Sequence, residues 1–299
     1  MIDRISLQVI KLITAIDRTL LAPYHGRVRP SSVRYKADQS AVTTYDRECE
    51  RALAVGLKSI TPGSDVVGEE QIDADPGAFN RINAARSVWV VDPIDGTGAF
   101  ARGEKTYGIM AAFIENGQTS RGFIYVPGRV RAGGADRCVC DPLFVVAQKG
   151  VGCFLNGERV SLSGRSQSLA TARVSFACRN QDRHFEGFLA EGVAGYLPRN
   201  NSAYDYASLL RGDRDAVFYS EGRTPEGAGK CPPWDHAAGV LAVQEAGGHV
   251  GLPYAPKSIA YDPLLRYDQL LVASSYELWT EMYDHVHLRA PALCTPRSV

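Results

Sequence analysis

Two aspartates lie three residues apart after a short apolar run, in the stretch WVVDPIDGT at residues 89–97. The run is typical of a buried strand, and Pro93 and Gly96 turn the chain sharply at its end. This turn holds Asp92 and Asp95 close together, and crowded carboxylates call for a cation. Hard oxygen ligands suit Mg²⁺ far better than zinc. The motif alone leaves open that Asp-Gly is simply a turn signal and that both acids are solvated.

Further acids have ordinary explanations when they are considered singly. Asp46 and Asp235 can cap helices, and Glu69 can be solvated. Four of the acids nevertheless share a position at the end of an apolar element: Glu69, Asp92, Asp95 and Asp235. Side chains from separate strands and from a helix N-terminus can converge on one cleft from such positions.

The first half of the chain is predicted to be rich in strands behind two helices. Apolar residues at helical spacing in the first 21 residues, interrupted by charges, indicate an amphipathic helix and neither a signal peptide nor a membrane span. Thr43 and Asp46 form a capping-box-like start to a helix over residues 46–60. The predicted strands are a short one ending in two acids at 64–70, one at 88–91, and a hairpin of 108–114 with 122–126.

The second half alternates short strands with helical stretches, which predicts a smaller α/β layer. The strands are expected at 173–177, 216–219 and 270–273, and the helices near 185–194 and 204–211. A further helix over 234–246 ends at Gly247 and begins with Asp235. Turn residues concentrate between about 147 and 170, so we expect two regions. These are an α+β region at 1–150, carrying Glu69, Asp92, Asp95 and Thr97, and an α/β region at 151–299, carrying Asp235.

Composition favours a small-molecule partner. The chain of 299 residues is 45% hydrophobic, enough to bury a substantial core. Lys plus Arg equal Asp plus Glu at 33 each, so no basic field attracts a nucleic acid polymer or an anionic membrane. Seven cysteines without a repeated framework fit a reducing compartment, and a cytoplasmic location is expected. Cys138 and Cys140 lack the partner set of a zinc site.

Four motifs occur in a fixed order over residues 36–248: KADQSAVTTYD at 36–46, GEE at 68–70, WVVDPIDGTGAF at 89–100, and PWDHAAG at 233–239 followed by EAGG. On these motifs the chain resembles the inositol monophosphatase superfamily of metal-dependent phosphomonoesterases. The resemblance implies a layered αβαβα sandwich of the α+β or α/β class. It also implies two or three Mg²⁺ ions as cofactors.

Carried over position by position, the resemblance implies two metal-binding sets that share Asp92. The first set consists of Glu69, Asp92 and the carbonyl of Ile94. The second consists of Asp92, Asp95 and Asp235. Two cations about 3.5 to 4 Å apart clamp the attacking and leaving oxygens of a displacement at phosphorus, which agrees with this arrangement.

The resemblance also implies catalytic roles for Glu69, Thr97 and Asp46. Glu69 and the Thr97 hydroxyl would orient a metal-activated water and take its proton, while Asp46 would hydrogen-bond Thr97. Lys36 would border the phosphate or a third metal site, and the backbone N–H groups of Gly96 and Thr97 would cradle the phosphate oxygens. The implied substrate-binding set is Lys36, Asp95, Gly96, Thr97 and Asp235.

Several positions depart from the family pattern or have two interpretations. Ala99 stands where the family usually has asparagine, which removes an amide that could brace the metal loop. Residues 40–43 read Ser-Ala-Val-Thr in place of Ser-Pro-Val-Thr and lose proline stiffness but no ligand. His236 is expected to pack rather than to act as a general acid, and at least one of Tyr204 and Tyr206 is expected in the core. Residues 221–233 form either a rim over the substrate or a disordered loop.

The leading function is Mg²⁺-dependent hydrolysis of a small polyol or sugar phosphate, inositol monophosphate being the default substrate of the family. Alternatives are a 3'(2'),5'-bisphosphate nucleotidase, favoured by the form of the first motif, and a histidinol-phosphate phosphatase. A different class of function is a non-catalytic protein that binds a phosphate ligand, but the intact acids argue against it. A homodimer is an expectation at the family level only.

Overall fold

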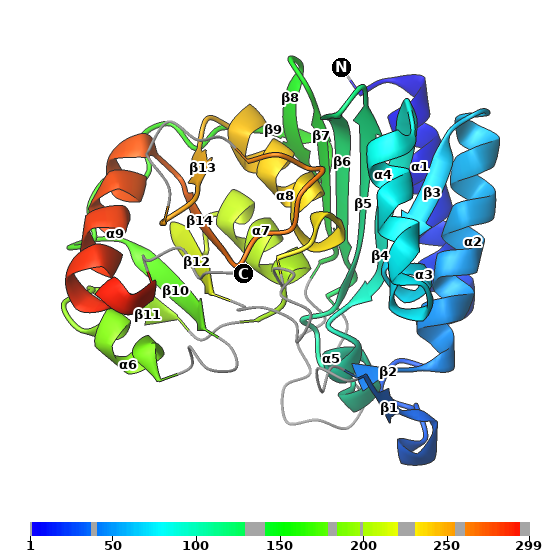
Figure 1. Cartoon of the computed structure of the whole chain (residues 1–299), viewed down its shortest axis with the longest axis horizontal. Coiled ribbons are helices and arrows are strands. Elements are labelled where there is room, and N and C mark those ends of the chain that lie inside the picture. Colours follow the sequence, from blue (N-terminus) through cyan, green and yellow to red (C-terminus); the bar gives the residue numbers. More distant parts are fainter. Residues whose placement is uncertain are drawn as a thin grey trace.

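Two β-sheets alternate with helices in five layers (Figure 1). The computed structural model describes residues 2–36, 41–128, 141–178, 184–197, 200–220, 231–254 and 261–293. From one side to the other, the layers are helices α1 and α2, a seven-stranded sheet, helices α7 and α8, a five-stranded sheet, and helices α6 and α9. The predicted αβαβα sandwich is confirmed.

The seven-stranded sheet has the strand order β3-β4-β5-β6-β7-β8-β9. Strands β3 and β4 are parallel, and every other neighbouring pair is antiparallel. The bounds are Asp65–Gly68 (β3), Ser87–Asp95 (β4), Gly108–Glu115 (β5), Gln118–Val126 (β6), Leu143–Gln148 (β7), Gly152–Leu155 (β8) and Glu158–Val160 (β9). Asn116 and Gly117 turn the predicted hairpin β5–β6 with φ values of 50° and 77°.

The five-stranded sheet has the order β11-β10-β12-β14-β13, and its pairs are parallel on the β10 side and antiparallel around β14. Its bounds are Arg173–Cys178 (β10), Gly195–Leu197 (β11), Ala216–Ser220 (β12), His249–Gly251 (β13) and Gln269–Ala273 (β14). A separate two-stranded pair joins β1 (Arg34–Tyr35) to β2 (Ala41–Val42).

The helices cover both outer faces and fill the space between the sheets. Their bounds are Arg4–Ile16 (α1), Thr44–Ile60 (α2), Glu69–Ala74 (α3), Asn80–Ala84 (α4), Thr97–Arg102 (α5), Phe185–Ala190 (α6), Ser202–Arg211 (α7), Pro233–Glu245 (α8) and Tyr276–Arg289 (α9). A π-helical turn, Asp17–Leu21, extends α1. None of the helices in the described ranges is both long and apolar enough to cross a bilayer.

Alternation along β4 divides its side chains between two cores. Val88 and Val90 join the apolar cluster around α7 and α8, between the sheets. Trp89 and Val91 join the cluster under α1 and α2. A strand that is buried on both faces reads as a continuous apolar run, as residues 88–91 do. This burial fixes β4 rigidly, and β4 carries three of the candidate site residues: Asp92, Ile94 and Asp95.

Two details of the sequence-based prediction need correction or qualification. Glu69 and Glu70 do not end strand β3, because the strand stops at Gly68 and both acids open helix α3. The division between residues 150 and 151 stays a prediction, but the first sheet continues to Val160 and the second begins at Arg173. Cys138, Cys140, part of the first motif (37–40) and residues 221–230 lie outside the described residues.

Candidate active site

Asp92 and Asp95 lie within the last four residues of β4, rather than in a turn that follows it. The pairing with β5 shifts register between them, so the strand is irregular where the two acids stand. Gly96 then adopts φ +86° as the N-cap of α5, where the chain leaves the sheet. Both carboxylates are therefore held by a buried strand whose end is bent.

Asp92 is a buried carboxylate among other acids. Its side chain is 2% exposed, and Oδ1 accepts the backbone N–H of Ile94 at 3.0 Å. Burial raises the pKa of Asp92 well above its usual range, and the neighbouring charges of Glu69, Asp95 and Asp235 raise it further. The other three predicted acids thus lie close enough to Asp92 to act on its charge.

Asp95 is fastened to the N-terminus of α7. Its Oδ2 accepts the backbone N–H of Ala203 at 2.5 Å, and its carbonyl oxygen accepts the Asn201 side-chain amide at 3.3 Å. Asn201 is also the N-cap of α7, since its Oδ1 accepts the N–H of Tyr204 at 2.9 Å. Sequence reasoning did not assign this role to Asn201, although an Asn before a helical pattern is an N-cap signal. Its amide contacts the backbone of Asp95, whereas Ala99 lies in helix α5.

Thr97 and Asp46 form the predicted hydrogen bond. The Thr97 hydroxyl donates to Oδ1 of Asp46 at 2.6 Å and also lies 3.0 Å from the carbonyl oxygen of Ile94. Oδ2 of Asp46 accepts both the backbone N–H and the hydroxyl of Thr43, each at 2.7 Å. Burial raises the pKa of Asp46 to about 6, against the effect of these hydrogen bonds. One carboxylate therefore closes the capping box of α2 and fixes the Thr97 hydroxyl.

Glu69 is paired with Lys36. The ammonium group lies 2.8 Å from Oε1 of Glu69 and 2.6 Å from Oε1 of Glu70. Burial acts to lower the pKa of Lys36, but the two carboxylates outweigh burial and raise it, so the lysine stays charged. Glu50 accepts the backbone N–H of Glu70 at 2.8 Å and thereby holds the start of α3. The expectation that Lys36 borders the phosphate group of a substrate or a third metal site stays a prediction.

Asp235 lies in the first turn of α8, as predicted. The next residue, His236, is 1% exposed, and its Nδ1 is 3.0 Å from the hydroxyl of Tyr206 on α7. The histidine also packs edge-on against Tyr219. These contacts fit the packing interpretation of His236, and they tie the helix that carries Asp235 to the helix that holds Asp95.

The donor set fits a divalent cation. Within the described ranges, no group of three or more carboxylate, imidazole or thiol side chains already has the arrangement of a metal site. However, the strongest charges acting on buried Asp92 are all acidic. Such uncompensated negative charge is costly, and a hard cation with oxygen ligands relieves it.

A family model described as the inositol monophosphatase family matches residues 8–287. The chain belongs to the inositol monophosphatase family. The resemblance to this family is thereby confirmed, and the four motifs lie inside the matched residues. Members of this family are phosphomonoester hydrolases that act on small phosphate esters.

The similarity to two curated relatives extends over most of this chain. An inositol monophosphatase of Dictyostelium discoideum is 28% identical over 264 residues, covering 86% of this chain and 87% of the relative. A histidinol-phosphatase of Chlorobaculum parvum is 31% identical over 233 residues, covering 77% and 78%. Among solved structures, a Ca-bound IMPase family protein of Staphylococcus aureus has a TM-score of 0.73 at 18% identity, covering 96% of both chains. That structural likeness supports the family fold.

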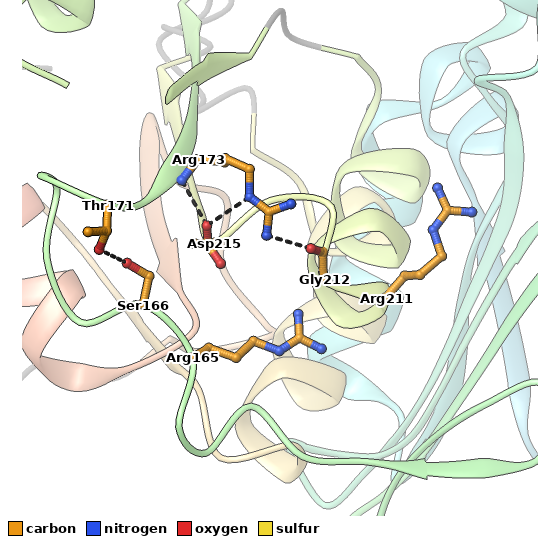
Figure 2. A pocket seen from close by; sticks show the side chains of 7 residues that line it. All are labelled: Arg165, Ser166, Thr171, Arg173, Arg211, Gly212 and Asp215. Atoms are coloured by element: carbon orange, nitrogen blue, oxygen red, sulfur yellow. Dashed lines mark hydrogen bonds and ion pairs between the residues drawn. The ribbon is translucent and has the colours of Figure 1, made fainter. Parts of the chain in front are cut away.

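A separate hollow of about 350 Å³ lies at the C-terminal end of α7 (Figure 2). Arg165 donates to the carbonyls of Leu209 and Leu210 at 2.8 and 2.9 Å, and Arg173 donates to that of Gly212 at 2.6 Å. These bonds satisfy the last carbonyls of α7, so the arginines anchor the helix. None of the predicted site residues lines this hollow. Its lining residues are Arg165, Ser166, Thr171, Arg173, Arg211, Gly212 and Asp215.

Proposed function

We propose that the protein is a Mg²⁺-dependent phosphomonoesterase that hydrolyses a small polyol or sugar phosphate. The observation that carries the proposal is the buried carboxylate of Asp92, surrounded by acids, next to the Thr97–Asp46 hydrogen bond. The Ca-bound relative of known structure supports a divalent cation in this fold. The choice of Mg²⁺ rests on the all-oxygen donor set. A cytoplasmic homodimer remains an expectation.

The residues proposed to hold the metal are the side chains of Glu69, Asp92, Asp95 and Asp235 and the carbonyl of Ile94. Bound there, Mg²⁺ would lower the pKa of a water molecule and offset the charge of the phosphate. The carboxylates alone would repel a phosphate dianion. Asp95 and Asp92 are already positioned by backbone N–H groups, each of which donates to one carboxylate oxygen.

Thr97 is proposed to orient the attacking water. Its single hydroxyl hydrogen is committed to Asp46, with Ile94 as the second acceptor. The oxygen of Thr97 can therefore only accept a hydrogen from a neighbouring water, which points a lone pair of that water away from Thr97. Glu69 is proposed as the proton acceptor. Its Oε1 lies 2.8 Å from the ammonium group of Lys36, which holds the carboxylate in place.

The backbone around Gly96 is proposed to bind the phosphate oxygens. Gly96 precedes Thr97 at the start of α5, where backbone N–H groups lack helical acceptors. A side chain at position 96 would intrude there, since its Cβ would lie 2.1 Å from Nδ2 of Asn201. The close approach of Asn201 therefore requires glycine at this position.

Release of phosphate from a panel of esters tests the proposal. The panel contains myo-inositol 1-phosphate, a sugar phosphate, histidinol phosphate and 3'-phosphoadenosine 5'-phosphate, each with millimolar Mg²⁺ and with a chelator. The protein should hydrolyse a polyol or sugar phosphate fastest, and the chelator should abolish the reaction. Preference for histidinol phosphate would favour the activity named for the Chlorobaculum relative. Release from no ester would contradict the proposal.

Two variants serve as the matched pair for this panel. Asp95→Asn alters a proposed metal ligand, the last residue of β4. Asp65→Asn alters an aspartate at the start of the adjacent strand β3, where it pairs with Arg81 at 2.5 Å. The first variant should lose phosphatase activity, and the second should keep it within about twofold, because surface ion pairs contribute little.

A further inference from the structure

Arg266 lies against two aromatic rings near Asp235. Its guanidinium carbon is 4.8 Å from the ring centroid of Phe79 and 4.9 Å from that of Trp234. The two rings are 6.5 Å apart and meet edge-on at 70°. Both ring faces attract a cation, so they hold the guanidinium in place without using its hydrogen-bond donors.

The donors of Arg266 have no acceptor in the part of the chain that the structure describes. Other arginines bond to oxygen atoms: Arg214 lies 2.6 Å from Asp205, and Arg81 lies 2.5 Å from Asp65. Arg266 is about half-buried, and burial lowers its pKa from the usual value. A partly desolvated guanidinium with five unused donors is suited to bind an anion bidentately.

The chain connections place Arg266 near Asp235, one of the proposed metal-binding acids. The next residue, Tyr267, pairs with Cys231 through backbone hydrogen bonds of 2.7 and 3.1 Å, just before α8 begins. Trp234, which contacts Arg266, adjoins Asp235 in the first turn of that helix. The carboxylate of Asp235 is also the charge that acts most strongly on Arg266.

This placement gives the proposed site a positively charged side chain that would still face the substrate after a metal ion has bound. Lys36 is already paired with Glu69 and Glu70. Once a divalent cation offsets the charge of Asp235, the positive charge of Arg266 is left to act on the substrate. A phosphate group bound at the metal-binding acids would have the alcohol part of the ester as its neighbour, and Arg266 lies near one of those acids, Asp235.

We propose that Arg266, clamped by Phe79 and Trp234, binds a second anionic group on the alcohol part of the substrate, either a carboxylate or a second phosphate. Arg266 is then a specificity-determining residue that, among polyol and sugar phosphates, favours those with a second anionic group over those without one. The inference rests on the proposed phosphomonoesterase function, whose substrate class it narrows.

Hydrolysis of matched esters tests the inference. One pair is 3-phosphoglycerate and glycerol 3-phosphate, which differ by a carboxylate, and the other is fructose 1,6-bisphosphate and fructose 6-phosphate. Wild type should show a lower KM for the doubly anionic member of one pair, and the pair affected tells a carboxylate from a phosphate. Arg266→Gln should raise that KM about tenfold or more while changing the KM of the singly anionic partner less than about twofold.

Binding of compounds that a phosphatase cannot hydrolyse separates this inference from the proposed activity. Calorimetric titration with Mg²⁺ present compares 3-phosphonopropionate with propylphosphonate, and 1,3-propanediylbisphosphonate is the second-phosphonate arm. Wild type should bind one of the doubly anionic compounds about tenfold more tightly than propylphosphonate, and Arg266→Gln should remove this difference. If wild type binds a doubly anionic phosphonate more tightly than propylphosphonate but hydrolyses no ester, the phosphatase proposal is wrong and the proposed anion site is supported.

Two control variants guard against a loss of structure. Arg266→Lys keeps the charge but not the planar fork, so part of the discrimination should remain. Arg289→Gln removes an arginine on α9 that pairs with Glu191 at 2.9 Å, and it should leave discrimination unchanged. Thermal unfolding confirms that each variant is folded. Equal effects of Arg266→Gln on both members of every pair, or no effect on any, would overturn the inference.

Discussion

The backbone N–H of Ala203 donates to the carboxylate of Asp95 at 2.5 Å, across a sequence separation of 108 residues. This bond joins the start of α7 to the end of β4, and Asn201 strengthens the junction by donating to the carbonyl of Asp95 at 3.3 Å. The position of a proposed metal ligand therefore depends on a helix from the second half of the chain. Neither Ala203 nor Asn201 lies in the four motifs of the sequence.

Replacing Asn201 tests this junction. Asn201→Ala removes an N-cap and the brace on Asp95, so it should destabilise the protein by about 1 kcal/mol and lower kcat by about tenfold. Ser275→Ala is the matched control, because Ser275 caps α9 by accepting the N–H of Leu278 at 3.1 Å. The control should lose similar stability in urea denaturation but keep its kcat. Equal kcat values for the two variants would show that Asn201 is only a helix cap.

Glycine 96 should tolerate no side chain. It has φ +86°, and an added Cβ would lie 2.1 Å from Nδ2 of Asn201 and 3.2 Å from the carbonyl of Thr106. Gly63 is a close match in backbone, with φ +87° and nothing within 4 Å of its Cβ position. Gly63→Ala should cost about 1 kcal/mol from backbone strain alone. Gly96→Ala should cost more in chemical denaturation and also abolish phosphate release, and an equal cost in both variants would contradict the close packing.

Removing the Thr97 hydroxyl should impair catalysis more than folding. Thr97→Val leaves Oδ1 of Asp46 without its 2.6 Å donor, which costs about 1 to 3 kcal/mol. It should also lower kcat about a hundredfold or more. Thr97→Ser should restore most of the activity, since it keeps the donor. In the control Thr61→Val, the lost hydroxyl accepts the Trp89 indole N–H at 2.8 Å, and only stability should fall.

His249 should make stability depend on pH. Its ring packs 4.9 Å from that of Trp279, and burial lowers its pKa below 6.5, so the folded protein favours the neutral ring. Below about pH 6.5 the unfolded chain binds more protons than the folded protein. Stability should therefore be greatest above that pH and should fall on acidification through the interval between the two pKa values. His249→Gln should show a shallower fall in urea denaturation, and an unchanged slope would assign the effect to other groups.

Local patterns in the sequence predicted the elements and the acids, but not the contacts that join the two halves. The buried run at 88–91, the Asn116-Gly117 turn and the capping residues Thr43 and Asp46 act over a few residues, and each appears in the structure as expected. Family resemblance supplied the Asp46–Thr97 pair, which the structure confirms at 2.6 Å.

Long-range packing explains what the sequence did not reveal. The aromatic clamp on Arg266 combines Phe79, between β3 and β4, with Trp234 on α8, and no spacing rule relates them. The pairing of Lys36 with both Glu69 and Glu70 arises because α3 begins at Glu69, where a strand was expected to continue. Such contacts depend on how whole elements pack.

Calorimetric titration of Mg²⁺ into chelator-treated wild type and Asp92→Asn tests the central claim, that buried Asp92 is the centre of a metal site. Burial and acidic neighbours raise the pKa of Asp92, so its charge is unfavourable without a cation. Wild type should bind Mg²⁺ saturably, whereas Asp92→Asn should remain folded and show no binding heat at the same concentrations. Equal binding by the two proteins, or no binding by wild type, would contradict the account.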